Sequence, residues 1–265
     1  ANGVTNVLEV KHSRNHTENM LLQSTDVLKI KRNNQGQNNI KVYGKSYLDP
    51  LKINVPGDPS SAAFFTALTL LTQNAQLEIK HVGLNPRRIG FYNLLKKHGA
   101  KIKFKNVKKI NHEVVGDIEV QSSKLKAINA SPKYYVLATD EYPILFVIAA
   151  LTKGMSVFKG IEDLANKESN RIEEMKKILW QIGIKCQSTK NEMKIYGVTE
   201  IKKINTTIKV PNLGDHRICM SSVILSFVTG IKAEIKNFET VRTSSPSFLE
   251  IIKSLGGEFE IKKTP

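Results

Sequence analysis

The chain repeats one pattern of helices and strands about every 70 to 85 residues, and this period strongly limits the folds open to it. Three units follow one another, preceded by the second half of a fourth. Each begins with an acidic or small-residue turn that leads into an apolar helix, expected over 62–71, 144–151 and 218–228. Helices that are apolar on nearly all sides are typical of a buried position, so we expect these three at the centre of the fold.

The remainder of each unit alternates strands with an amphipathic helix. The expected strands after the apolar helices are 75–79, 155–159 and 233–236. The amphipathic helices are expected over 88–98, 170–182 and 247–255, each ending at a glycine suited to a left-handed C-cap. Closing strands follow at 101–105, 185–187 and 258–262, and the opening half-unit supplies strands 7–10 and 27–31 around a helix over 17–22. The pattern predicts an α/β fold with apolar helices inside, sheets outside and amphipathic helices between them.

A change of composition predicts one boundary. Residues 33–55 are rich in Asn, Gln and Gly and lead to Pro56-Gly57, a pair typical of a turn. We therefore expect residues 1–54 to be part of one lobe and residues 55–265 to form a second lobe of three units. The chain starts with Ala1 rather than Met, so a fragment or a processed chain is expected.

Composition narrows the function classes. The net charge of +16 comes mostly from Lys beside abundant Ile and Asn, a mixture that an AT-rich genome produces, and no Arg-rich tract or zinc finger is present. The charge is therefore interpreted as solvated surface, with no nucleic-acid partner. No apolar run reaches the ~18 residues of a membrane span, and no signal peptide opens the chain. Two cysteines agree with a reducing cytoplasm, and His12 and His16 have no obvious third metal ligand, so no metal is expected.

Acidic residues at the starts of the apolar helices are the first candidates for a functional site. Asp58, Asp140 and Asp215 each stand where a helix presents free N–H groups and a partial positive charge. N-capping alone explains an acid there, and it is the favoured interpretation of Asp58, which is followed by Ser60 and Ser61. For Asp140, followed by another acid, capping and function remain equally open.

Basic residues supply the other candidates. Lys167 and Arg171 flank Glu168 in the loop entering the middle amphipathic helix, and they would share one side of that helix if it had already begun. The group is either a surface ion-pair cluster or a clamp for phosphate or carboxylate. Arg217 enters an apolar helix, where an Arg is uncommon unless it meets an anion, and Arg14 lies in the loop equivalent to that of Lys167. His216 and Cys219 are interpreted as structural residues.

Five motifs together resemble EPSP synthase (3-phosphoshikimate 1-carboxyvinyltransferase). They occur in the family's order at residues 13–18 (SRNHTE), 56–61 (PGDPSS), 140–143 (DEYP), 167–171 (KESNR) and 215–217 (DHR). The sequences GDPSS and DEYP are similar to those of the glyphosate-tolerant bacterial class of the family. The resemblance covers the C-terminal three-fifths of a family member and implies an inside-out α/β barrel built from βαβαββ units. It also implies that the 265-residue chain alone is inactive.

The resemblance implies a reaction and assigns roles. The family transfers the enolpyruvyl group of phosphoenolpyruvate to the 5-hydroxyl of shikimate 3-phosphate by addition and elimination, in the pathway to chorismate and aromatic amino acids. Asp140 is then the base and Glu168 the acid. The residues expected at shikimate 3-phosphate are Arg14, Asp140 and Lys167, and those expected at phosphoenolpyruvate are Glu168, Arg171 and Arg217. The implied enzyme needs no cofactor and is a cytoplasmic monomer when full length.

Departures and rivals are also visible. Asn15 and Asn170 stand where the family usually has Asp, and Ser245 where Phe is common, which affects affinity more than reaction type. The nearest alternative function is that of the related enolpyruvyl transferase that acts on UDP-N-acetylglucosamine. The sequence KESNR argues against this alternative. A rival of another class is an RNA-associated protein with βαβαββ units, and a third is a fragment without activity.

Overall fold

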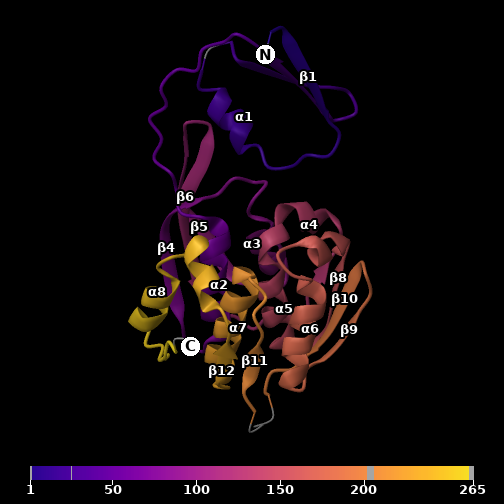
Figure 1. The fold of residues 1–265 in the computed structure, drawn as a ribbon, viewed down its shortest axis with the longest axis vertical. Helices are drawn as coiled ribbons and strands as arrows, with labels where there is room; N and C mark the ends of the chain where they lie inside the picture. Colours follow the sequence, from indigo (N-terminus) through magenta and orange to yellow (C-terminus); the bar gives the residue numbers. More distant parts are fainter. Residues whose placement is uncertain (1, 25, 202–205, 263–265) are drawn as a thin grey trace.

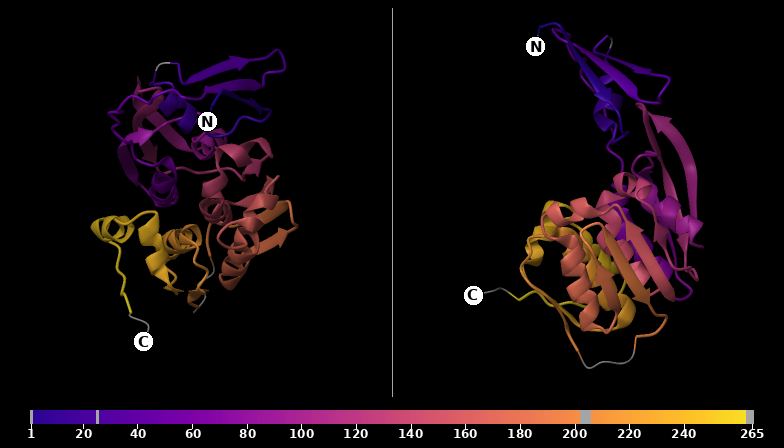
Figure 2. Two further views of the ribbon diagram at one scale, coloured as in Figure 1. Left: turned by 45° about the horizontal axis from the view of Figure 1, so that its top comes forward. Right: turned by 90° about the vertical axis from the view of Figure 1, so that its right-hand side faces the viewer.

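A small N-terminal sheet stands apart from the main body of the molecule (Figures 1 and 2). The computed structural model describes residues 2–24, 26–201 and 206–262. Strands β1 (Val4–Glu9), β3 (Asn38–Tyr43) and β2 (Leu28–Arg32) pair antiparallel in that order, and helix α1 (His16–Leu21) lies in the β1–β2 connection. From Tyr43 to Pro59 the chain forms no helix or strand beyond a single bridge of Gly57 with Val82.

Three apolar helices occupy the centre of the main body, as predicted. They are α2 (Pro59–Leu71), α5 (Tyr142–Ala150) and α7 (His216–Thr229), and each packs on the other two. All nine residues of α5 are buried. Burial on every side explains why these helices carry no polar face. The shared packing brings their N-terminal ends together.

Three sheets surround the central helices. Strands β4 (Gln76–Gly83), β6 (Glu113–Gln121) and β5 (Lys101–Ile110) form an antiparallel sheet in that order. A second sheet has the order β7 (Asn129–Ala130), β8 (Gly154–Lys159), β10 (Glu192–Gly197) and β9 (Lys185–Ser188). A parallel pair joins β11 (Ile208–Val210) to β12 (Ala233–Ile235). The half-buried strands leave one sheet face in water, as their alternation predicts.

The amphipathic helices are α3 (Gly90–Lys97), α6 (Arg171–Gln181) and α8 (Phe248–Ser254). The glycines after them, Gly99, Gly183 and Gly256, have φ of 98°, 79° and 87°, which confirms the predicted left-handed caps. Shorter helical segments are α4 (Lys133–Leu137) and the 3-10 segments Thr139–Glu141, Glu162–Asn166 and Phe238–Thr243.

One predicted strand is wrong. Residues 258–262 form no strand in the described structure. In the other two units, the strand after the amphipathic helix pairs with the strand that follows it, as β5 pairs with β6 and β9 with β10. Residues 258–262 have no such following strand among the described residues. A strand forms by backbone hydrogen bonds to a neighbouring strand, so an alternating sequence without such a neighbour does not become one.

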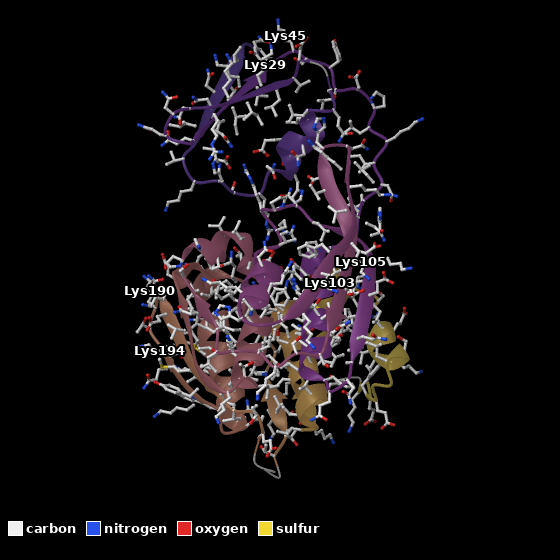
Figure 3. The ribbon with its side chains drawn as sticks, turned by 180° about the vertical axis from the view of Figure 1, so that it is seen from behind. Lys29, Lys45, Lys103, Lys105, Lys190 and Lys194 are labelled. Atoms are coloured by element: carbon white, nitrogen blue, oxygen red, sulfur yellow. The ribbon has the colours of Figure 1, made fainter. Side chains whose placement is uncertain are left out.

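The many lysines of the chain are spread over the surface of the molecule. Figure 3 labels six lysines on or next to the outer strands: Lys29, Lys45, Lys103, Lys105, Lys190 and Lys194. Several of the lysines pair with acids on the same sheet, as Lys105 does with Glu119 and Lys194 with Glu192. No helix within the described ranges is long and apolar enough to cross a membrane.

Candidate functional site

Asp140 and Arg14 meet although 126 positions separate them in the chain. Asp140 lies in the 3-10 turn that leads into α5, and Arg14 lies in the loop before α1. The Arg14 Nη2 donates to Asp140 Oδ2 at 2.6 Å. Burial raises the pKa of Asp140, but the Arg14 hydrogen bond and the charges of Arg217 and Arg171 outweigh burial and hold it below its ordinary value. Asp140 is therefore an ionised carboxylate at neutral pH and can accept a proton.

Arg171 and Asp215 form a buried ion pair at the start of α6. Arg171 is 1% exposed and Asp215 is fully buried. Arg171 Nε donates to Asp215 Oδ2 at 2.9 Å, and the Ser169 hydroxyl donates to the same oxygen at 2.8 Å. Asp215 also caps α7 by accepting from the backbone N–H of Arg217. Burial alone would raise the pKa of Asp215. The hydrogen bond from Arg171 and its positive charge have the larger effect, so the pKa of Asp215 lies below its ordinary value.

Glu168 and Lys167 lie at the edge of this cluster. Glu168, 44% exposed at its side chain, accepts from Arg171 Nη2 at 2.5 Å. Lys167 pairs instead with Asp163 at 2.8 Å. Lys167 directly follows the 3-10 segment Glu162–Asn166, and α6 begins only at Arg171. The helix has not begun at Lys167, so the shared helix face considered for Lys167 and Arg171 does not form.

Arg217 has a free donor in a buried position. Its side chain is 8% exposed, and Nε donates to His216 Nε2 at 3.1 Å. Its Nη1 has no hydrogen-bond partner among the described residues. Burial and the charge of Arg217 lower the pKa of His216, so the ring is neutral at pH 7 and its nitrogen can accept. The structural interpretation of His216 agrees with this contact.

The residues that depart from the family pattern have local roles. Asn170 is the N-cap of α6 and accepts from the Glu173 N–H at 3.2 Å. Asn15 Oδ1 accepts from Asn85 at 2.9 Å. Ser245 is 8% exposed and continues the turn after Val241. An amide can make the first two contacts as well as a carboxylate can, so neither substitution disrupts its loop.

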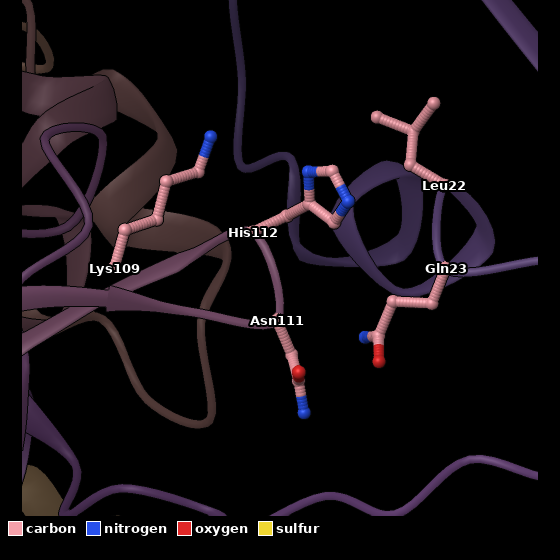
Figure 4. A pocket seen from close by; sticks show the side chains of 5 residues that line it. All are labelled: Leu22, Gln23, Lys109, Asn111 and His112. Atoms are coloured by element: carbon pink, nitrogen blue, oxygen red, sulfur yellow. The ribbon is translucent and has the colours of Figure 1, made fainter.

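The described residues contain no group of three His, Cys, Asp or Glu side chains that could hold a metal ion. The positive charges of Arg14, Arg171 and Arg217 instead all act on Asp140, and Glu168 is hydrogen-bonded to Arg171. An open hollow elsewhere, between α1 and the β5–β6 hairpin, is lined by Leu22, Gln23, Lys109, Asn111 and His112 (Figure 4). None of the predicted site residues lines that hollow.

Comparison with known proteins identifies the family. The sequence model of EPSP synthase (3-phosphoshikimate 1-carboxyvinyltransferase) matches residues 1–252. The chain belongs to the EPSP synthase family. The 3-phosphoshikimate 1-carboxyvinyltransferase of Zymomonas mobilis is 35% identical over 261 residues, which are 98% of this chain and 57% of that relative. The enzyme of the same name from Petrotoga mobilis is 38% identical over 257 residues, or 96% of this chain and 57% of the relative.

Solved structures place the chain in the same fold. The EPSP synthase of Acinetobacter baumannii superposes with a TM-score of 0.88 at 33% identity, covering 99% of this chain and 59% of that one. The enolpyruvyl transferase NikO of Streptomyces tendae has the same fold, with a TM-score of 0.70 at 12% identity. The predicted α/β enolpyruvyl transferase fold is confirmed. This EPSP synthase-family chain spans about 57% of the length of the curated relatives named above.

Sequence reasoning missed two parts of the cluster. Asp215 was recognised as a helix cap, but its pairing with Arg171 was not. Glu141, directly after Asp140, is 2% exposed and was not assigned a role. Both Asp215 and Glu141 stand beside the first residues of an apolar helix. A charged residue at such a position is expected to be buried and to need a charged partner, so the sequence does contain a signal for both.

Proposed function

We propose that the complete protein transfers the enolpyruvyl group of phosphoenolpyruvate to the 5-hydroxyl of shikimate 3-phosphate and releases phosphate. One observation carries this proposal most directly: Arg14 holds Asp140 ionised, while Arg217, whose charge also acts on Asp140, has a donor without a partner among the described residues. A carboxylate base beside cationic donors is the arrangement that deprotonates a hydroxyl near anionic substrates.

The residues have distinct roles in the proposed reaction. Asp140 accepts the 5-hydroxyl proton as that oxygen bonds to C2 of phosphoenolpyruvate, and Glu168 donates a proton to C3. The tetrahedral intermediate then loses a C3 proton and phosphate, which restores the carbon–carbon double bond. Each acid–base group is expected to contribute about 10²- to 10⁴-fold to the rate.

Cationic side chains hold the substrates in this proposal. Arg14 and Lys167 bind shikimate 3-phosphate, and Arg171 and Arg217 bind phosphoenolpyruvate. Arg217 has a donor for this role in Nη1, which is buried and has no partner among the described residues. Arg171 is bonded to Glu168, so an incoming anion competes with Glu168 for the guanidinium and releases the carboxyl toward the reacting carbon. Lys167 would exchange Asp163 for a phosphate in the same way.

We further propose that residues 1–54 belong to the N-terminal lobe and residues 55–265 form the C-terminal lobe. The separate sheet of β1, β2 and β3 and the segment from Tyr43 to Pro59 without secondary-structure elements support this division. The substrates would then lie between the lobes, where Arg14 meets Asp140. The complete enzyme is proposed to be a cytoplasmic monomer, and we expect no turnover by the 265-residue chain alone.

Calorimetric titration of the complete gene product tests the proposal. Shikimate 3-phosphate should bind first, and phosphoenolpyruvate should bind more tightly once shikimate 3-phosphate is present. Glu250→Gln, which changes an exposed acid on α8 outside the cluster, is the matched control and should bind both ligands. No binding, or preference for UDP-N-acetylglucosamine, would overturn the proposal in favour of the sister activity or an inactive protein.

A further inference from the structure

Glu141 is a buried carboxyl that no part of the proposed reaction uses. It closes the 3-10 turn before α5 and is 2% exposed. Its Oε1 has no hydrogen-bond partner among the described residues. A buried carboxylate without partners is costly, so its position needs an explanation.

A chain of polar contacts ties Glu141 to the first repeat unit. The hydroxyl of Ser60, a fully buried residue on α2, hydrogen-bonds to Glu141 and accepts from Arg88 Nη2 at 2.9 Å. The same Arg88 nitrogen donates to Asp58, the N-cap of α2, at 2.8 Å. Ser60 has one hydroxyl proton, which can point toward Glu141 while Arg88 donates to the Ser60 oxygen.

A second unpartnered group shares this buried region. Arg217 begins the third central helix, and its Nη1 is also buried without a partner in the described structure. Arg217 is close enough to Glu141 for its charge to affect the carboxyl, and Asp140 and Arg88 are too. The N-terminal ends of α2, α5 and α7 pack together around these groups. In this region one carboxyl, that of Glu141, and one guanidinium, that of Arg217, thus each have a buried polar atom without a partner among the described residues.

We propose that Glu141 is a positioning residue that takes up a proton when an anion binds to Arg217. The ionised carboxyl balances the Arg217 charge while the anion site is empty. An arriving anion supplies that balance itself, and a second negative charge beside it is unfavourable, so the carboxyl takes a proton from solvent. This inference rests on the anion-binding role proposed for Arg217.

The neighbouring groups set the pH range of this exchange. Burial raises the pKa of Glu141 to about 7, the Asp140 charge adds to the rise, and the Ser60 hydrogen bond and Arg217 and Arg88 charges oppose it. The pKa of Asp140 is lowered, that of His216 is lowered below 6.5, and the nearby Tyr92 and Tyr142 titrate only above neutral pH. Glu141 is therefore the group in this cluster that changes charge near pH 7.

Calorimetric titration of the 265-residue chain with sodium sulfate tests the coupling, because sulfate does not itself titrate in this range. Titrations in two buffers of different ionisation enthalpy measure the protons taken up. We expect uptake at pH 7 to 8, and affinity about tenfold weaker near pH 8.5 than near pH 6, the order expected for one like charge beside a buried carboxyl. Glu141→Gln should abolish both effects while sulfate still binds.

Two further variants make the result specific. Ser60→Ala removes the hydrogen bond that favours the ionised carboxyl, so the pH dependence should move to higher pH. Glu250→Gln changes an exposed acid on α8 and should behave as the wild type. Sulfate binding with the same proton uptake in wild type and Glu141→Gln overturns this inference alone. Absence of sulfate binding by the wild type overturns the anion site and this inference with it.

Discussion

Acidic residues at the starts of the three central helices differ in how they are partnered, and this decides what each can do. All three pair with an arginine from another part of the chain: Asp58 with Arg88, Asp140 with Arg14, and Asp215 with Arg171. Only the last pair is fully buried at both side chains. Asp140 remains 22% exposed and Asp58 42%. Asp215 therefore anchors Arg171, and the more open Asp140 is the acid proposed to act on a substrate.

Sequence alone could find these acids but not their partners. Helix-start position identified Asp58, Asp140 and Asp215, since capping depends on neighbours in the chain. The pairing of Asp140 with Arg14 depends on how the N-terminal part folds back onto the main body, and no local pattern encodes it. Lys167 shows the same limit, because Asp163 on the preceding 3-10 segment captures it.

Asp215→Asn should strongly destabilise the chain. The substitution leaves the buried Arg171 with the partly exposed Glu168 as its remaining charged partner, and breaking a buried pair from one side costs about 3–5 kcal/mol. Urea unfolding of the 265-residue chain measures the change. Glu260→Gln, in the exposed pair with Lys262, is the control and should cost less than about 1 kcal/mol. Equal losses from the two substitutions would contradict the anchoring role of Asp215.

At the scale of elements, the repeat predicted helices better than strands. A helix makes its hydrogen bonds within itself, so α2, α5, α7 and the amphipathic helices could be predicted from periodicity and their glycine caps. A strand depends on a neighbour that the local sequence does not specify. The prediction therefore placed a strand at 258–262, where no partner edge exists among the described residues, and did not place β11, which pairs with the distant β12.

Burial of α5 on all sides makes its large side chains important to stability. Phe146 is fully buried, with its ring 5.0 Å from that of Phe158. Phe146→Ala should lower the free energy of unfolding by about 3–5 kcal/mol, because the cavity cannot collapse between packed helices. Phe227→Ala on α7, where the side chain is 36% exposed, should cost less than half as much. Denaturant titration of both variants measures the difference, and a larger loss for Phe227 would contradict the predicted centre.

At the scale of the whole molecule, polar contacts hold the N-terminal sheet against the main body. Glu113, at the start of β6, accepts from Asn19 at 2.8 Å and contacts His16 at 2.7 Å, both in α1. Asn85 also donates to Glu113, at 3.1 Å. A second contact joins Arg87 to Glu9 at 3.3 Å. The relative placement of the two parts thus depends on a few polar side chains.

Glu113→Ala should loosen this junction. Three partners lose their acceptor, so hydrogen–deuterium exchange in residues 4–24 and 26–43 should accelerate about 5- to 30-fold, the equivalent of roughly 1–2 kcal/mol. Glu119→Ala is the matched control, since Glu119 lies on the same strand and pairs with Lys105 on the same sheet. Unchanged exchange in the N-terminal part of the Glu113 variant would show that other contacts hold it.

The N-terminal sheet should also become less stable in acid. Burial raises the pKa of Glu9, but hydrogen bonds from Ser13, His12 and Asn38 outweigh burial and lower it from 4.5 to about 2. A folded-state pKa below the unfolded value gives stabilisation that is present above pH 4.5 and lost as pH falls toward 2. Urea unfolding across this range should show the loss, and Glu9→Gln should reduce its slope. If the dependence of the free energy of unfolding on pH is the same in Glu9→Gln as in the wild type, Glu9 is not the group responsible for it.

Phosphate release by the complete protein is the direct test of the proposed enolpyruvyl transfer. With shikimate 3-phosphate and phosphoenolpyruvate, we expect one phosphate to be released for each enolpyruvyl group transferred. Glu168→Gln should keep shikimate 3-phosphate binding but lose about 10²- to 10⁴-fold in turnover, the contribution of one general acid. Phosphate release that requires UDP-N-acetylglucosamine in place of shikimate 3-phosphate would contradict the proposed substrate. Full turnover by the Glu168 variant would contradict the proposed role of Glu168 as the acid.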